Sequence, residues 1–267
     1  MSPLYDAHNH LQDDRIHQWA GNLVDACREI GVRRMVVNGA SEGDWPAVRT
    51  LAATFPMVLP SFGCHPWYLH ERTAGWLEVL TSFLNDVPSA VGEIGLDRWK
   101  PGLSYEGQEE VFVAQLRLAA ERNLPVSIHC LEAWGRMEEL LRLNPRPARG
   151  FLLHSYGGPR EMVKRLADLG AYFSFPGYYA HERKTRQRDT FQHVPAERLL
   201  VETDAPDQRL PDALNRFPLT DAVTELPLNH PANLGAVYEC VSALRGLPPI
   251  VLATQVEQNF LRLFGGL

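Results

Sequence analysis

The chain has 267 residues, 45% of them hydrophobic, which is enough for one large core. Its formal net charge of −6 argues against a protein that coats nucleic acid through bulk charge, but it permits local binding of a phosphate at a metal. No apolar run approaches the ~18 residues of a membrane span, and "MSPLYDAHNH" lacks the basic and apolar regions of a signal peptide. We therefore expect a cytoplasmic protein with no membrane partner and no obligate protein partner. The four cysteines are far apart and form no CxxC pair, so reduced thiols are favoured over a disulfide framework.

Eight short apolar runs read as strands, with amphipathic stretches between them. In chain order the runs cover residues 3–10, 34–40, 57–66, 89–97, 125–130, 150–157, 171–177 and 198–207. After the fourth run, Phe112, Leu116 and Ala119 recur at helical spacing. Strands that alternate with helices predict a parallel sheet covered by helices, and eight repeats favour a closed (β/α)8 barrel of the TIM type. A doubly wound sheet is the alternative, weakened because the chain has no GxGxxG or GxxxxGK[ST] loop.

No linker, internal repeat or low-complexity tract divides the chain, so we expect a single domain over residues 1–267. One stretch, residues 206–231, departs from the alternating pattern because it carries five prolines directly after the eighth run. In a barrel this connection lies on the C-terminal side of the strands. We expect it to overlie the active site there.

Polar residues occur at or near the ends of most of the predicted strands. They are His8, His10, His65, Glu93, His129, His154 and Asp204. In a parallel barrel these ends meet at the face where active sites form. His8 and His10 are two residues apart, so both side chains point to one side of their strand. A lone HxH is more often a polar turn, but the whole set predicts a metal site.

The predicted metal ligands are His8, His10, Glu93, His129, His154 and Asp204. They are too many for one tetrahedral ion with an open position, and they suit two divalent ions ~3.5–4 Å apart that share a carboxylate. We expect Glu93 to be the bridge. His8, His10 and Asp204 would complete one ion's site, and His129 with His154 the other. Imidazole-rich ligation favours Zn, Mn, Fe, Co or Ni over Ca, with Mg possible.

The charge of this site favours an anionic substrate. Two divalent ions bring four positive charges and the two carboxylates return two negative ones, so a phosphate ester could bind and a metal-bound water would deprotonate readily. We take Asp204 and Glu93 as the catalytic residues, with Asp204 as a general base, although a helix cap is another reading of "ETDAPD". Glu202 is expected to share the face of Asp204 and to orient a ligand histidine. His65 is equally compatible with a ligand, a donor or a local cap.

Seven segments carry a resemblance to a known family. "DAHNHL", "GCHPW", "VGEIGLD", "LPVSIHC", "LLHSYGG", "LLVETDAP" and "NHP" resemble, in order, the signatures of the TatD-related metal-dependent deoxyribonucleases, which are amidohydrolase-like barrels. The resemblance runs from residue 6 to about 260. It implies the same six metal ligands, and it implies that His65 contacts the substrate phosphate. The chain departs from the family pattern after His129, after His154 and at Arg98-Trp99, which concerns the substrate more than the chemistry.

The leading hypothesis is a two-metal phosphodiesterase that acts on DNA or another phosphoester. One alternative keeps the metals and hydrolyses an aminoacyl ester, lactone or amide, and another is a metal-containing binding protein without turnover. The basic run 181–188 could bind a nucleic-acid backbone, but a solvated helix face is favoured. Trp67, Trp99 and Tyr178 follow strand ends, where they could stack a base or pack the rim.

Overall fold

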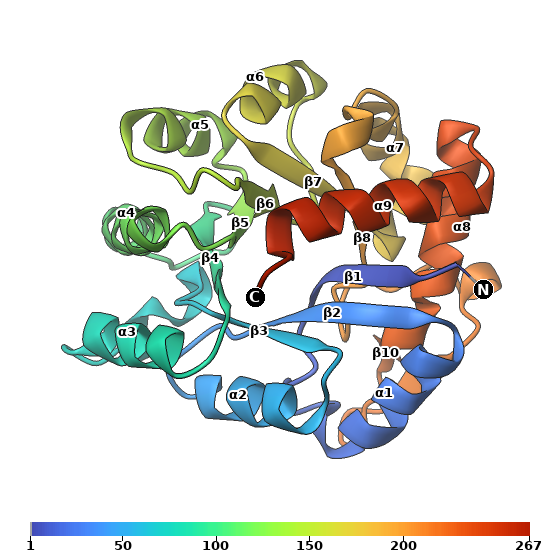
Figure 1. Ribbon diagram of the computed structural model, residues 1–267, viewed down its shortest axis with the longest axis horizontal. Coiled ribbons are helices and arrows are strands. Elements are labelled where there is room, and N and C mark those ends of the chain that lie inside the picture. The colour runs from blue at the N-terminus through green and yellow to red at the C-terminus, as the bar shows by residue number, and fades with distance from the viewer. Residues whose placement is uncertain (1) are drawn as a thin grey trace.

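The computed structural model describes residues 2–267, and its centre is a barrel of eight parallel strands (Figure 1). Their order in the sheet is their order in the chain. The strands are β1 (Leu4–Asn9), β2 (Val32–Asn38), β3 (Val58–Phe62), β4 (Ala90–Asp97), β5 (Val126–Leu131), β6 (Phe151–Leu153), β7 (Ala171–Pro176) and β8 (Leu199–Glu202). Each of the eight runs marked in the sequence overlaps one of these strands, which confirms the predicted TIM barrel.

The last strand meets the first beyond the residues of regular pairing. Asp204 N–H donates to the His8 carbonyl at 2.9 Å, and His10 N–H donates to the Ala205 carbonyl at 2.7 Å. These two bonds close the barrel at the carboxyl ends of β1 and β8. They also fix the backbone of three predicted ligands relative to one another.

Helices surround the barrel because each parallel connection must cross back outside the sheet (Figure 1). They are α1 (Ala20–Glu29), α2 (Trp45–Thr54), α3 (Trp76–Asp86), α4 (Tyr105–Arg122), α5 (Trp134–Leu143), α6 (Val163–Asp168), α7 (Thr185–Gln192), α8 (Leu234–Arg245) and α9 (Pro249–Phe264). In α4, Phe112, Leu116 and Ala119 are buried, as their spacing predicted. Strands β2 and β5 are hydrophobic and buried along most of their length, as expected for a sheet covered on both faces.

Three predicted strands extend several residues beyond the observed ones, and one of them is the eighth, because β8 ends at Glu202 and Asp204 lies in the loop that follows. β3 ends at Phe62, so His65 lies in the following loop and caps a short 3-10 helix, Pro66–Glu71. β6 is only three residues long, and His154 comes directly after it. Proline in "GCHPW" and the glycines of "SYGG" explain the early ends, because these residues favour turns over strand pairing.

The proline-rich segment contains a hairpin that the sequence pattern did not reveal. β9 (Pro218–Thr220) pairs antiparallel with β10 (Pro227–Asn229). Asn229 anchors the hairpin near β8, since its side-chain amide donates to the Thr203 carbonyl at 2.8 Å. Arg15, in the loop after β1, binds Asp207 at the start of the segment. The segment is therefore attached at the same end of the barrel as the predicted ligands.

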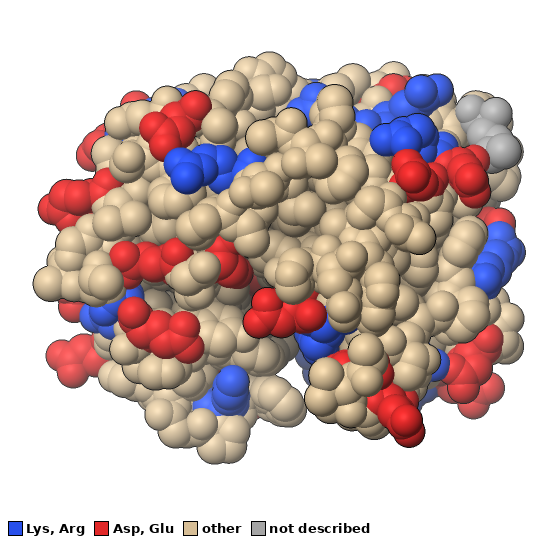
Figure 2. Space-filling model, turned by 90° about the horizontal axis from the view of Figure 1, so that it is seen from below, with Lys and Arg blue, Asp and Glu red and all other residues tan. Residues whose placement is uncertain are grey.

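Among the described residues, no single helix has the length and apolar character needed to cross a membrane. The helical stretches Pro231–Arg245 and Pro249–Phe264 meet that test only together, and they are bent by 106° at the break between them. The face of the molecule in Figure 2 carries acidic and basic side chains side by side, without a field of one sign.

Candidate metal centre

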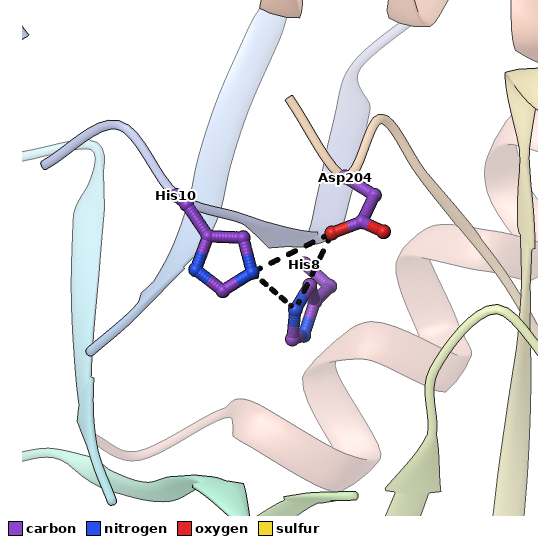
Figure 3. A group of neighbouring side chains, drawn as sticks. All are labelled: His8, His10 and Asp204. Atoms are coloured by element: carbon purple, nitrogen blue, oxygen red, sulfur yellow. Dashed lines mark hydrogen bonds and ion pairs between the residues drawn. The ribbon is translucent and has the colours of Figure 1, made fainter. Parts of the chain in front are cut away.

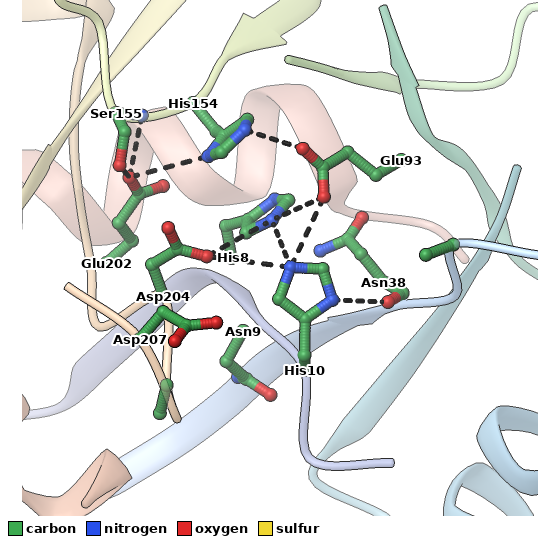
Figure 4. A network of polar contacts seen from close by, with 12 residues as sticks. His8, Asn9, His10, Asn38, Glu93, His154, Ser155, Glu202, Asp204 and Asp207 are labelled. Atoms are coloured by element: carbon green, nitrogen blue, oxygen red, sulfur yellow. Dashed lines mark hydrogen bonds and ion pairs between the residues drawn. The ribbon is translucent and has the colours of Figure 1, made fainter. Parts of the chain in front are cut away.

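The other five predicted ligands lie around Glu93, and Figure 4 shows four of them, His8, His10, His154 and Asp204. His8 comes from β1 and His10 from the residue after it, Glu93 from β4 and His129 from β5. His154 and Asp204 follow β6 and β8. Glycine makes the approach of β4 to β5 possible, because a Cβ at Gly95 would lie 2.0 Å from the His129 carbonyl oxygen. All of these side chains are buried except that of His10, which is partly exposed.

One group of ligand atoms lies around Oε2 of Glu93. Nε2 of His8 is 3.4 Å from this oxygen, and Nε2 of His10 is 3.2 Å from it. The two Nε2 atoms are 3.2 Å apart, and Oδ1 of Asp204 lies 3.6 Å and 3.5 Å from them (Figure 3). We call His8, His10 and Asp204 the first group.

A second group lies around the other oxygen of Glu93. Nε2 of His154 is 2.7 Å from Oε1, and Nδ1 of His129 is 3.2 Å from it. These two nitrogens are 3.4 Å apart. We call His129 and His154 the second group. Each oxygen of Glu93 therefore faces a different pair of predicted ligand imidazoles, and Oε1 also has Nε2 of His65 at 3.3 Å. A carboxylate that bridges two ions is expected to have such an arrangement.

The donor atoms of this centre fit a cation. Nδ1 of His10 must donate to the Asn38 carbonyl, 2.8 Å away, so the neutral ring turns a lone pair at Nε2 toward Glu93 and Asp204. Nδ1 of His8 lies 2.7 Å from the Ser127 hydroxyl, which likewise leaves Nε2 directed inward. The imidazole lone pairs and the carboxylate oxygens point toward one another with no proton between them. They repel one another unless a positive charge lies among them. Imidazole and carboxylate are common ligands of divalent transition metals.

The pKa values show the same demand for positive charge. Burial lowers the pKa of His154, but the neighbouring Glu93 carboxylate outweighs it and raises the pKa to about 9. The pKa of His10 is also raised, because the bonds to Asp204 and Glu93 exceed the effect of burial. Burial would raise the pKa of Glu93, yet the surrounding histidines hold it well below its usual range. His8, by contrast, stays neutral because burial and the charge of His154 lower its pKa to about 4.

His65 lies beside this centre in a defined protonation state. Its Nδ1 accepts a bond from Trp67 N–H at 3.2 Å, so Nε2 carries the proton of the neutral ring. Burial lowers the His65 pKa to about 4, which favours that neutral form. Nε2 points at Oε1 of Glu93 from 3.3 Å. Of the three roles left open by the sequence, this geometry favours a local cap whose outward N–H is a donor.

Four residues lie behind the candidate ligands, and sequence reasoning pointed only to Glu202. The three that it missed are Asn38, Asp97 and Ser127, which hold His10, His129 and His8. Asp97 ends the "VGEIGLD" strand, so its position at a strand end was the available signal. Glu202 lies 3.9 Å from Nδ1 of His154, too far for a hydrogen bond, and accepts bonds from Ser155 and Ser174 instead.

Comparisons with known proteins identify the family of this chain. The model of the TatD-related DNase family matches residues 5–265. The chain belongs to this family. The 3'-5' ssDNA/RNA exonuclease TatD of Escherichia fergusonii is 30% identical, with 98% of this chain and 99% of that protein covered. The TatD exonuclease of Pantoea ananatis is 33% identical over 91% of this chain and 92% of its own length.

A solved structure of a TatD-family member supports the same conclusion. The TatD homologue YJJV of Escherichia coli superposes with a TM-score of 0.88 at 26% identity, covering 98% of this chain and 97% of that one. The family resemblance seen in the motifs is thus confirmed, and with it a metal-dependent TatD-type hydrolase that acts on ester bonds. The ligand assignments themselves stay predictions, although the structure places His8, His10, His129 and His154 within 3.4 Å of Glu93 and Asp204 within 3.6 Å of His8 and His10.

The aromatic and basic residues of the rim have varied surroundings. Trp67 donates its indole N–H to Asp97 at 2.6 Å, and Lys100 lies over its ring. Trp99 is 59% exposed. Arg183 and Lys184 both lie over the ring of Tyr178. In the basic run 181–188, Arg188 donates to backbone carbonyls and so has a structural role.

Proposed function

We propose that this protein is a two-ion exonuclease that removes nucleotides from the 3′ end of single-stranded DNA or RNA. The observation that carries the proposal is the placement of Glu93, whose two oxygens face two separate pairs of predicted ligand imidazoles. The curated relatives, named as 3'-5' ssDNA/RNA exonucleases and matched over nearly their whole length, support the substrate class. The match over residues 5–265 supports one catalytic domain, and the cytoplasm stays the predicted compartment.

The first group with Oε2 of Glu93 would hold one divalent ion, and the second group with Oε1 would hold the other. Such ions supply Lewis-acid stabilisation of the phosphate oxygens and lower the pKa of water. Zn and Mn suit the imidazole-rich donor set best, and Mg suits it less because only two of the six ligands are carboxylates.

Asp204 is placed to hold a proton during the reaction. Its Oδ1 faces the two imidazoles of the first group, and Oδ2 is turned away from them (Figure 3). Burial would raise the Asp204 pKa, but the bond from His10 and the charge of His154 lower it, so the carboxylate is ionised and able to accept a proton. Oδ2 is the oxygen that we expect to receive it.

His65 is placed to bind substrate. Its Nε2–H points into the centre beside Glu93, and burial keeps the ring neutral. A neutral N–H donor stabilises a phosphate oxygen without competing with the carboxylates for the cations. We therefore assign His65 to the substrate phosphate.

The test is strand cleavage with oligonucleotides labelled at either end. Metal-stripped protein is reloaded with Mn, Zn or Mg, with Asp204→Asn as the control. A 3′-to-5′ exonuclease releases labelled mononucleotide at once from 3′-labelled single strands, and it shortens 5′-labelled strands stepwise. Loss of both signals in Asp204→Asn is expected. Cleavage that persists without metal would contradict the proposal. It would also be contradicted if the protein hydrolysed aminoacyl esters or lactones but cleaved neither DNA nor RNA.

A further inference from the structure

Asp97 is a buried carboxylate with an acceptor role at both oxygens. Oδ1 accepts the backbone N–H groups of Trp99 at 2.8 Å and Lys100 at 2.9 Å. Oδ2 accepts the indole N–H of Trp67 at 2.6 Å, and Nε2 of His129 lies 2.9 Å from the same oxygen. The three other partners can only donate, so they are satisfied by an ionised carboxylate, which has no proton to give. His129 must therefore donate its Nε2 proton to Asp97 as well.

The backbone of Asp97 is itself held in place. The buried Gln108 side chain in α4 accepts from Asp97 N–H at 2.7 Å and donates to the Asp97 carbonyl at 2.9 Å. The carboxylate is therefore a fixed acceptor, and it fixes the ring of His129 in turn. With the proton on Nε2, the lone pair of His129 is on Nδ1, which faces Oε1 of Glu93 from 3.2 Å.

We infer that Asp97 is a positioning residue for the ion of the second group: it takes the Nε2 proton of His129 and so commits Nδ1 as the atom that binds the ion. The inference rests on the proposed function in one respect, because it takes His129 as a ligand of that ion. Its consequence is a difference among the four histidines, since His8, His10 and His154 present Nε2 to Glu93 while His129 presents Nδ1.

The substitution Asp97→Asn distinguishes this positioning role from a role in packing alone. Asparagine keeps the shape of the side chain but has one acceptor oxygen for two pairs of donors. If that oxygen keeps the Trp99 and Lys100 N–H groups, the NH2 group faces His129, and the ring must then accept at Nε2 and carry its proton on Nδ1. That tautomer has no lone pair for the ion. A carboxylate behind a ligand histidine acts through this choice of tautomer as well as through orientation.

The first experiment is zinc binding by equilibrium dialysis with elemental analysis, on the wild type, Asp97→Asn and the control Trp67→Phe. The control removes one donor to Asp97 and leaves the carboxylate. We expect Asp97→Asn to bind the second ion about 10- to 100-fold more weakly and the first ion unchanged. Retained first-ion binding shows that the variant is folded. Wild-type affinity for both ions in Asp97→Asn, or equal loss in Trp67→Phe, would overturn the inference.

The second experiment needs no substitution of Asp97. Nitrogen NMR of the zinc-loaded wild type, with His129 identified by the signals missing in His129→Gln, shows which ring nitrogen carries the proton. The inference requires it on Nε2, and a proton on Nδ1 contradicts it. This outcome is independent of nuclease activity. An enzyme that cleaves DNA while His129 carries its proton on Nδ1 would refute the role of Asp97 and leave the proposed function intact.

Discussion

The first and second groups of the centre are held by different kinds of partner. Behind the first group stand neutral acceptors, the Ser127 hydroxyl for His8 and the Asn38 carbonyl for His10. Behind the second group, the Asp97 carboxylate is bonded to His129, whereas Nδ1 of His154 has no hydrogen-bond partner among the described residues and Glu202 lies 3.9 Å from it. A charged partner makes an imidazole more basic and holds it more firmly than a neutral one does. Loss of an outer partner should therefore cost more metal affinity in the second group.

Substitution of Glu93 tests whether the first and second groups act together. Glu93→Gln removes the charge between them and the acceptor that faces both groups. We expect kcat/KM on single-stranded DNA to fall at least about a thousandfold, because metal stabilisation of the transition state amounts to several kcal/mol. Activity within tenfold of the wild type, in a variant with wild-type circular dichroism, would show that the two groups do not depend on this carboxylate.

Substitution of Asp204 tests the first group alone. Asp204→Asn removes the proton acceptor and the charge beside His8 and His10. We expect kcat to fall about 10²- to 10⁴-fold, the range for loss of a general base. The second ion should still bind, which dialysis against zinc measures. Loss of both ions would mean that the two groups are one cooperative site.

Metal loading tests the centre as a whole. The folded state alone brings these ligands together, so ions at 100 times their dissociation constant should stabilise it by about 2.7 kcal/mol per site. At about 2–4 °C per kcal/mol, Tm should rise by about 5–10 °C for each ion. Scanning calorimetry before and after loading measures this rise. Glu93→Gln is the control, and an equal rise in that variant would place the ions elsewhere.

Ser127 gives the smallest expected effect. Ser127→Ala removes the neutral acceptor behind His8 and leaves the ligands in place. A hydrogen bond of this type contributes about 0.5–1.5 kcal/mol, so the first ion should bind about two- to tenfold more weakly. The second ion should be unaffected. A loss larger than that of the second ion in Asp97→Asn would reverse the comparison between the two groups.

The sequence predicted the barrel and the candidate ligands for one reason. Buried parallel strands are apolar throughout, so polar residues such as Glu93 in "VGEIGLD" and His129 in "VSIHC" stand out. The partners behind the ligands did not stand out. Ser127 is an ordinary strand residue, and Asn38 acts through its backbone carbonyl, which every residue has.

Other features required the fold itself. The strands β9 and β10 have three residues each, too few for a periodic pattern, and each begins with proline. His65 was expected at a strand end, whereas the structure makes it a cap with a defined donor atom. The distinction between Nδ1 and Nε2 of a histidine depends on its neighbours in space, which no spacing along the chain encodes.

The most direct test of two ions on either side of Glu93 is anomalous diffraction from crystals loaded with Mn²⁺. The account predicts two peaks about 3.5–4 Å apart, one against His8, His10 and Asp204 and the other against His129 and His154. A single peak, or two peaks of which neither contacts Glu93, would contradict it.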